Sequence, residues 1–250
     1  MAPENTLTAF RRAVELGAGF IETDLQLTRD ARLVALHDEK LDRTTNGKGA
    51  VSAKTLDELR SLEAGLWFKP AHNSSGQGPA SAKGFSGERI PTVEEVLQFG
   101  RQNDIGLFLE AKATRPSGAE HAIVGALRAA NEVPRSVVIS FDESFLTRAR
   151  GMEPLLVTGL LYSKSLPDAV SHAVAAGARM LLPRADRVTR KLVEEAHAHD
   201  LKVVTWTVNE RPQMEELAAA GVEGIMTDVP DVLAGVVKDL KAKKTQAERR

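Results

Sequence analysis

Three carboxylates occupy positions that the strands of a barrel interior normally fill with apolar side chains. Glu22 and Asp24 are two residues apart in the segment 21–25, and Glu110 ends the apolar segment 107–110. Side chains two apart on a strand point to the same face, so Glu22 and Asp24 should lie side by side. Buried carboxylates repel each other and lose hydration, and a hard divalent cation with oxygen ligands relieves both costs. The three carboxylates together could form a metal site, whereas the pair Glu22 and Asp24 alone would favour a simpler explanation.

Simpler explanations of the same residues stay open at this point. Glu22 and Asp24 would also suit an exposed strand whose apolar neighbours pack inward. Glu110 is followed two residues later by Lys112, so the two could form an ordinary salt bridge at a strand end. A lysine at that end could instead bind a phosphate, because active sites of barrels form where the strands end.

Two further side chains stand at predicted strand ends. His37 follows the apolar run 33–36, and Trp206 follows the run 203–205. An imidazole titrates near neutrality and can exchange protons during phosphoryl transfer. An indole could wall a small polyol. Structural roles are the alternatives, namely a strand-end histidine and a packed core tryptophan. The remaining histidines are weaker candidates because they fall on predicted helices or in a polar insertion: His72, His121, His172, His197 and His199.

Short apolar runs alternate with amphipathic segments along the chain, which is typical of repeated βα units. Strands are predicted at residues 19–27, 33–37, 105–110, 137–141, 155–160, 179–182, 202–208 and 224–228. Helices are predicted at residues 5–16, 92–102, 119–131, 143–150, 166–176, 189–199, 212–220 and 229–241. Only residues 28–32 join the first two strands, too few for a parallel crossover, so this pair should be antiparallel. We expect a distorted α/β barrel.

Composition limits the remaining choices. The 250 residues suit one barrel, and we predict a single domain over residues 1–241, with a polar insertion at 64–89 and a charged tail at 242–250. A net charge of -1 gives no reason to expect a nucleic-acid partner. The absence of cysteine excludes disulfides and thiolate metal sites. No run approaches the roughly 20 apolar residues of a membrane span, and no signal peptide is recognised.

The ordered motifs resemble those of the glycerophosphodiester phosphodiesterase family over nearly the whole chain. The matching segments are Pro3-Glu4-Asn5-Thr6, Ile21-Glu22-Thr23-Asp24, His37-Asp38, Leu41-Asp42-Arg43-Thr44-Thr45, Ile90-Pro91-Thr92, Leu109-Glu110-Ala111-Lys112, Trp206-Thr207-Val208-Asn209 and Thr227-Asp228-Val229-Pro230. Each motif alone is weak, whereas the ordered set is specific.

The resemblance implies a TIM-type (β/α)8 barrel that hydrolyses a glycerophosphodiester to sn-glycerol 3-phosphate and an alcohol. It implies a divalent metal, Mg²⁺ or Ca²⁺, on Glu22, Asp24 and Glu110. Lys112 would contact the phosphate of this small-molecule substrate, and Trp206 would line its pocket near Trp67 and Phe68 of the insertion. His37 would be one of two acid/base histidines. The alternatives are a phospholipase D-like enzyme acting on lysophospholipids and a non-catalytic homologue that binds phosphate or metal.

One part of the family pattern is not found. A His-Arg-Gly segment on the first barrel strand should precede Pro3, and the sequence as given begins at Met1. We therefore expect a barrel that lacks its first strand, with weak or no turnover by this chain alone. Strand edges left open in this way favour pairing with a second chain, hence a homo-oligomer. A cytoplasmic location is expected, with a secreted or periplasmic location as the alternative.

Overall fold

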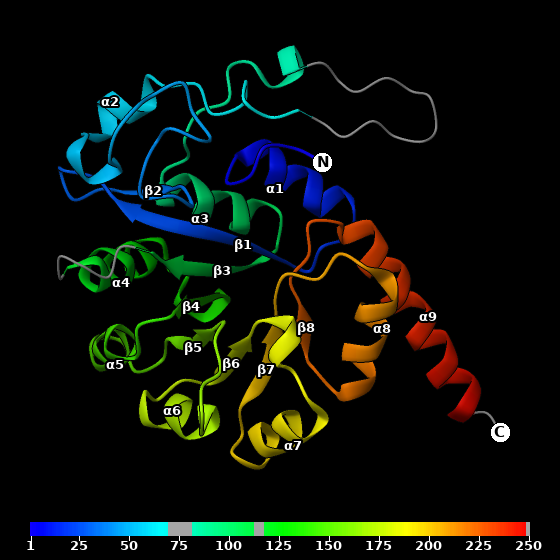
Figure 1. Ribbon diagram of the computed structural model, residues 1–250. Helices are drawn as coiled ribbons and strands as arrows, with labels where there is room; N and C mark the ends of the chain where they lie inside the picture. Colours follow the sequence, from blue (N-terminus) through cyan, green and yellow to red (C-terminus); the bar gives the residue numbers. More distant parts are fainter. Residues whose placement is uncertain (70–81, 113–117, 249–250) are drawn as a thin grey trace.

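The computed structural model of the chain describes residues 1–69, 82–112 and 118–248. Within these residues, eight strands form one sheet in the order β2-β1-β3-β4-β5-β6-β7-β8, and Figure 1 shows this sheet curling with helices along its outer side. The strands are β1 (Phe20–Leu27), β2 (Leu33–Ala35), β3 (Gly106–Ala111), β4 (Ser136–Ser140), β5 (Val157–Tyr162), β6 (Met180–Pro183), β7 (Lys202–Thr205) and β8 (Gly224–Ile225).

Helices alternate with these strands as the rhythm of the sequence predicts. The α-helices are α1 (Leu7–Glu15), α2 (Leu56–Arg60), α3 (Val93–Gln102), α4 (Ala119–Ala130), α5 (Glu143–Met152), α6 (Ala169–Ala175), α7 (Arg190–Ala198), α8 (Arg211–Ala220) and α9 (Pro230–Glu248). Short 3-10 turns are η1 (Val51–Ala53), η2 (Ala82–Phe85), η3 (Val133–Arg135) and η4 (Ala185–Arg187). The predicted alternation of strands and helices is confirmed.

The antiparallel pairing of the first two strands is also confirmed. Strand β1 pairs antiparallel with β2 and parallel with β3, whereas all later neighbours are parallel. A tight turn joins β1 to β2, with Thr28 and Arg32 bonded in both directions: Thr28 N donates to the Arg32 carbonyl at 2.8 Å, and Arg32 N donates to Thr28 Oγ1 at 2.9 Å. Ala31 adopts a left-handed φ of 57° in this turn.

The sheet is curled but open in the part of the chain that the structure describes. Its two ends are β2 and β8, and these strands do not pair with each other. Residues 20–23 of β1 therefore have only β3 as a strand neighbour, and Phe20 at this edge is 57% exposed. The residues that the structure describes thus agree with the expectation of a distorted barrel.

Two apolar layers hold the sheet in place. The inner layer fills the curl with alternate residues of successive strands: Phe108, Val137, Ile139, Leu161, Leu182 and Val204. The outer layer lies between the sheet and the helices and includes the fully buried Leu25, Leu109 and Phe145. Each such side chain contributes roughly 1.5–3 kcal/mol by leaving water. The two layers hold the strands in fixed positions, and the polar side chains of these strands are held in place with them.

Several boundaries differ from the prediction. Helix α9 continues past the predicted end at residue 241 to Glu248, because the charged run that follows consists mostly of good helix formers. Strands β7 and β8 end before the predicted 208 and 228, where the chain turns into loops over the sheet. Helix α2 was not predicted. No helix among the described residues is long and apolar enough to cross a bilayer.

The predicted domain extent, insertion and tail stay predictions. Residues 70–81 of the insertion at 64–89 lie outside the described part of the chain. Its described residues include η2, and the Ala64 N–H donates to the Glu88 carbonyl at 2.9 Å, which brings the two ends of the insertion together.

Candidate active site

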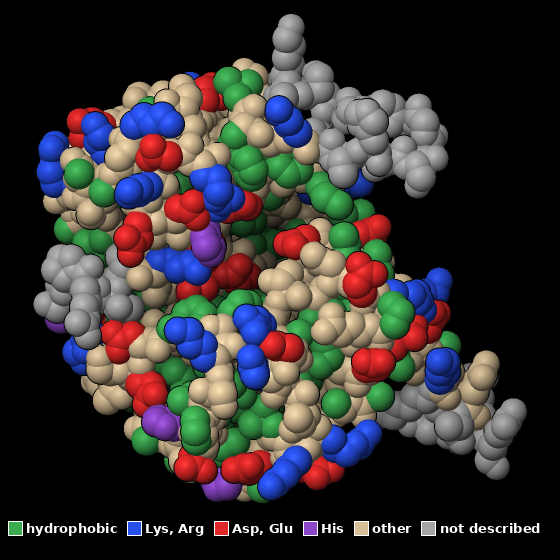
Figure 2. All heavy atoms as spheres, in the orientation of Figure 1, with side chains coloured by type: hydrophobic (Ala, Val, Ile, Leu, Met, Phe, Trp, Pro, Cys, Tyr) green, Lys and Arg blue, Asp and Glu red, His purple; other side chains and the backbone are tan. Residues whose placement is uncertain are grey.

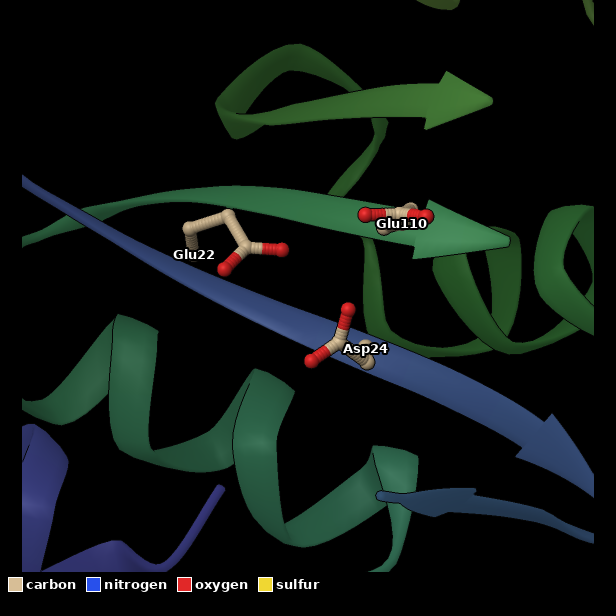
Figure 3. Close-up of side chains that lie close together, drawn as sticks. All are labelled: Glu22, Asp24 and Glu110. Carbon is tan, nitrogen blue, oxygen red and sulfur yellow. The ribbon is translucent and has the colours of Figure 1, made fainter. Parts of the chain in front are cut away.

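Strands β1 and β3 bring the three predicted carboxylates together. Asp24 stands directly opposite Glu110 in the parallel register of the two strands, and Glu22 precedes Asp24 by two residues on the same face. Each residue offers one carboxylate oxygen, and these oxygens all lie within 4.8 Å of one another. Figure 3 shows the three side chains facing a common space above the two strands. The sequence prediction that these residues cluster is correct.

The environment of Glu22 shows what the cluster needs. Its Oε1 atom is buried without a hydrogen-bond partner. Burial raises the pKa of Glu22 well above its ordinary value, and the neighbouring charges of Asp24 and Glu110 raise it further. Burial also raises the pKa of Glu110, against the opposing effect of Lys112. A divalent cation would supply the missing partner and offset the repulsion, and three carboxylates are the hard oxygen donors that Mg²⁺ and Ca²⁺ prefer.

Lys112 is the cation that the described residues place beside this cluster. Its Nζ lies 2.8 Å from Glu110 Oε1 and 3.1 Å from Asp24 Oδ1. Burial alone would lower the pKa of Lys112, but the two carboxylates outweigh it and the pKa is raised. The predicted salt bridge to Glu110 is therefore present, with Asp24 as a second partner. An ammonium group held here lies where an anionic ligand of the cluster would arrive.

Asn5 orients one of the three carboxylates. Its Nδ2 donates to Asp24 Oδ2 at 2.8 Å, while its Oδ1 accepts from the Asp24 N–H at 3.1 Å and from Thr23 Oγ1 at 2.5 Å. Asn5 adopts a left-handed φ of 54°, a conformation that asparagine tolerates better than most residues. The side chain of Asn5 thus contacts both the backbone and the carboxylate of Asp24 on β1. Its role was not predicted from the sequence.

His37 lies just past β2, close to the carboxylate cluster. The Leu36 N–H donates to the Asp24 carbonyl at 2.9 Å, and Gln26 Nε2 donates to the His37 carbonyl at 3.1 Å, so β1 fixes this part of the backbone. The ring is half-exposed, and a protonated His37 would lower the pKa of Glu110 through its charge. Its Nδ1 lies 2.8 Å from Asp38 Oδ1.

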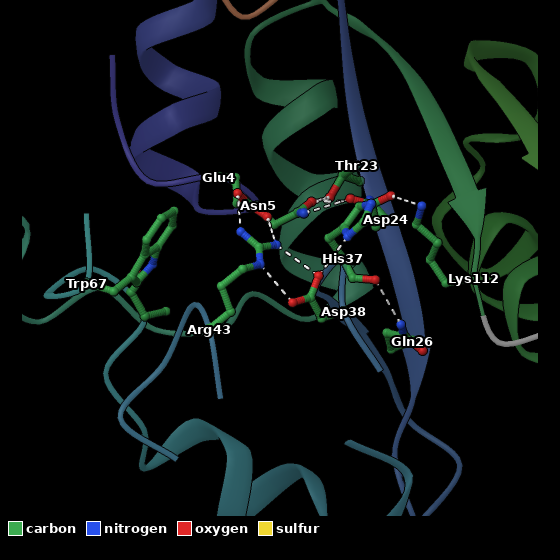
Figure 4. A network of polar contacts seen from close by, with 11 residues as sticks. Glu4, Asn5, Thr23, Asp24, Gln26, His37, Asp38, Arg43, Trp67 and Lys112 are labelled. Carbon is green, nitrogen blue, oxygen red and sulfur yellow. Dashed lines mark hydrogen bonds and ion pairs between the residues drawn. The ribbon is translucent and has the colours of Figure 1, made fainter. Parts of the chain in front are cut away.

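An arginine holds the carboxylate that contacts His37. Figure 4 shows Arg43 between Asp38 and Glu4, and its guanidinium group makes two bonds to each. The bonds from Arg43 hold the pKa of Asp38 well below its usual range, with a smaller contribution from His37. Trp67 from the insertion lies with its ring 5.8 Å from the guanidinium carbon of Arg43, a cation–π distance. The sequence motif contained these residues but did not reveal the connection.

Aromatic side chains stand at the mouth of the curled sheet. Trp206 follows β7, donates its Nε1–H to the Leu182 carbonyl at 2.9 Å, and packs edge-on against Phe141 with 5.7 Å between ring centroids. Phe141 is 48% exposed and lines an open cavity of about 520 Å³ together with Glu110 and Lys112. The predicted position of Trp206 at a strand end is confirmed, and Phe141 is the neighbour that the sequence reasoning missed.

Three other histidines of the described residues have a bonded partner on or beside the outer helices. His172 contacts Glu143 at 3.0 Å, His197 contacts Glu223 at 2.9 Å, and His199 Nδ1 lies 3.0 Å from the Glu195 carbonyl oxygen. His72 lies outside the described residues. Asp228 accepts a bond of 2.8 Å from Asn209 Nδ2 and so joins the loops that follow β7 and β8.

Figure 2 shows this face of the molecule hollowed at its centre, with acidic side chains in the hollow. An α/β barrel sheet with an acidic cluster on two adjacent strands, β1 and β3, defines the class of a TIM-type barrel with a candidate metal site. Residues 1–232 match the glycerophosphoryl diester phosphodiesterase family. The chain belongs to this family, and the family predicted from the sequence motifs is confirmed.

Two relatives and two solved structures show how far the similarity extends. The chain is 38% identical over 238 residues to the glycerophosphodiester phosphodiesterase of Caldanaerobacter subterraneus subsp. tengcongensis, covering 94% of this chain and 93% of the relative. It is 35% identical over 253 residues to a glycerophosphodiester phosphodiesterase of Bacillus subtilis, covering 94% of this chain and 82% of the relative.

Two solved structures match this chain over nearly its whole length. An Oleispira antarctica phosphodiesterase in complex with the product sn-glycerol-3-phosphate superposes with a TM-score of 0.83 at 26% identity, covering 95% of this chain and 92% of the other. A glycerophosphodiester phosphodiesterase from Agrobacterium tumefaciens gives a TM-score of 0.79 at 25% identity, covering 94% of each chain. The predicted TIM-type fold is therefore confirmed.

Proposed function

We propose that this protein is a metal-dependent phosphodiesterase that hydrolyses glycerophosphodiesters to sn-glycerol 3-phosphate and an alcohol. The observation that carries the proposal is the group of Glu22, Asp24 and Glu110 beside Lys112, in which one buried carboxylate oxygen has no partner. Family membership and the product named in the Oleispira antarctica structure support the choice of substrate class.

The three carboxylates would hold a divalent metal, for which Mg²⁺ and Ca²⁺ are the candidates. When bound, such an ion supplies a positive charge that favours a phosphodiester anion and its transition state. Lys112 would then release one carboxylate and turn its ammonium group toward a phosphate oxygen. Removing repulsion from a phosphodiester is the main requirement for its hydrolysis, because the anion resists nucleophiles.

His37 is the proton carrier that the described residues place beside the cluster. With Nδ1 directed at Asp38, its Nε2 is the nitrogen left to accept or donate a proton at the reacting oxygens. In-line displacement at phosphorus suits two proton carriers on opposite sides of the reacting group. Trp206 and Phe141 would form the wall against which the substrate's carbon skeleton packs.

The test is release of sn-glycerol 3-phosphate from glycerophosphocholine by residues 1–250, with Mg²⁺ or Ca²⁺ and then with excess chelator. We expect turnover that requires the metal and falls at least 100-fold in His37→Ala, since general acid–base catalysis contributes roughly that factor or more. A matched control is His197→Ala, which removes a histidine of α7 that pairs with Glu223. Equal losses in both variants would contradict the assigned role of His37.

The alternatives predict different results in the same assay. A phospholipase D-like activity would cleave lysophosphatidylcholine faster than glycerophosphocholine. A non-catalytic homologue would bind metal and inorganic phosphate in a calorimeter without releasing product at high protein concentration. Weak activity that rises when a strand carrying His-Arg-Gly is added ahead of Met1 would support a second acid/base histidine. Absence of both metal binding and product in that extended chain would end the proposal.

A further inference from the structure

Two adjacent residues before α1 contact two parts of the candidate active site, the carboxylate cluster and the group around His37. Asn5 bonds Asp24 of the carboxylate cluster, and its neighbour Glu4 bonds Arg43, which in turn bonds Asp38. Figure 4 shows the two branches leaving adjacent residues. We propose that Glu4 is a positioning residue that acts through Arg43 and Asp38 to fix the tautomer and orientation of His37. The kinetic part of this inference rests on the proposed function.

Arg43 can link the orientation of Glu4 to that of Asp38 because it makes two hydrogen bonds to each carboxylate. Its Nη1 and Nη2 donate to the two oxygens of Glu4 at 2.9 Å and 2.6 Å. Its Nε and Nη2 donate to the two oxygens of Asp38 at 2.7 Å and 2.9 Å. A planar guanidinium bonded in this way fixes the plane of each carboxylate, which a single-point contact from lysine would not do.

Asp38 is the last link to the histidine. Its Oδ1 accepts from Arg43 and also lies 2.8 Å from His37 Nδ1. An ionised carboxylate accepts hydrogen bonds and donates none, so the proton of a neutral ring resides on Nδ1. The Nε2 lone pair is then free for proton transfer. Selection of one nitrogen by a carboxylate on the other is a general way of preparing histidine for chemistry.

Stability alone does not account for the chain of contacts. The side chains of Glu4 and Arg43 are 40% and 45% exposed, and that of His37 is 51% exposed. Ion pairs this open to water contribute about 0–1 kcal/mol each to folding. Loss of Glu4 should therefore leave the folded protein almost as stable, while letting Asp38 and the ring of His37 turn.

The tautomer can be measured without turnover, by nitrogen-15 NMR of protein labelled in histidine. We expect the neutral ring of His37 to be protonated on Nδ1 and unprotonated on Nε2, with a shift toward the Nε2–H form in Asp38→Ala and a mixture in Glu4→Gln. The control is Glu15→Gln, which removes a Glu–Arg ion pair of similar exposure on α1. A His37 spectrum unchanged in both Glu4→Gln and Asp38→Ala would overturn the proposal.

Kinetics of the single and double variants test whether Glu4 acts through Asp38. We expect kcat to fall about 10-fold in Glu4→Gln and about 100-fold in Asp38→Ala, with little change in KM or Tm. The double variant should be no slower than Asp38→Ala. Multiplied losses in the double variant would show that Glu4 acts independently, and a matching fall in Tm would show a structural role. An inactive parent protein would defeat the proposed function, while the NMR result would still decide this inference.

Discussion

The Oε1 atom of Glu22 is buried without a hydrogen-bond donor, and Glu22, Asp24 and Glu110 each place one carboxylate oxygen within 4.8 Å of the others. Such a charge destabilises the metal-free fold, because burial removes its hydration and Asp24 and Glu110 repel it. The same arrangement is what a cation would bind. The Glu22 side chain therefore reduces the stability of the metal-free protein and would contribute affinity for a cation.

Glu22→Gln should stabilise the metal-free protein at pH 7. Folding raises the pKa of Glu22, so its favourable contribution is complete below the unfolded value of about 4.3 and is lost as pH rises through the raised value. We expect the variant to gain about 1–2 kcal/mol in free energy of unfolding at pH 7 and to match the parent near pH 4. Denaturant titration in chelator at both pH values measures this. A destabilised variant at pH 7 would contradict the burial argument.

Glu110→Gln should weaken metal binding much more than folding. Loss of one ligand charge is expected to raise the Kd for Mg²⁺ or Ca²⁺ by about 100-fold, with little loss of stability because the pKa of Glu110 is already raised by burial. Calorimetric titration gives the Kd. The control is Glu120→Gln, whose carboxylate bonds Arg148 at 3.0 Å and should affect stability alone. Equal loss of folding and affinity in Glu110→Gln would indicate a structural salt bridge instead.

The sequence was sufficient to predict the carboxylate cluster but not its supporting contacts. Glu22, Asp24 and Glu110 are recognisable because charged residues interrupt apolar strands. Asn5 and Arg43 lie in loops, and nothing in their spacing shows which distant carboxylate each would bond. Only the fold brings these loops over the strand ends, so their contacts could not be derived from local pattern.

At the scale of elements, the segment before α1 is fixed to β1 by Asn5. Its side chain makes two hydrogen bonds with Asp24 and one with Thr23. Asn5→Ala should raise the Kd for metal about 10-fold, since partners that orient a ligand typically contribute that much. Isothermal titration measures the change.

A matched control for Asn5→Ala is Thr189→Ala. Thr189 caps α7 by accepting from the Leu192 N–H at 3.1 Å, far along the chain from the carboxylates. Its loss should cost about 1 kcal/mol of stability and leave metal affinity unchanged. If the two variants lose affinity equally, Asn5 affects the site only through general destabilisation.

Elements were predictable where local pattern and packing agree. Strand β3 combines an apolar run with a preceding turn, in which Asp104 has a left-handed φ of 52°. Helix α2 was missed because five residues are too few to show a helical period, although Thr55 and Glu58 form a capping box that marks its start. Strand β2 ends at Ala35, two residues before the predicted end at residue 37, although the Leu36 N–H still donates to the Asp24 carbonyl of β1.

At the scale of the whole molecule, the open sheet edge predicts self-association of the 250-residue protein. Residues 20–23 have a strand partner on one side only in the described structure, and Phe20 is 57% exposed there. We expect concentration-dependent dimers in sedimentation velocity that weaken in Phe20→Ser. Leu155→Ser is the control. Leu155 is 81% exposed in the turn before β5, and strands β3 and β4 separate β5 from β1 in the sheet. A monomer at all concentrations would contradict the prediction.

Both tryptophans of the chain stand beside the candidate active site. Trp67 covers Arg43, and Trp206 packs against Phe141 above the curled sheet. Intrinsic tryptophan fluorescence of this protein therefore comes from two positions, one beside Arg43 and one beside Phe141, and the sequence contains no other tryptophan. Trp67→Phe leaves an emission that follows the barrel mouth, and Trp206→Phe leaves one that follows the arginine. Changes at Trp206 and changes around Arg43 can thus be recorded separately, in real time and without a label.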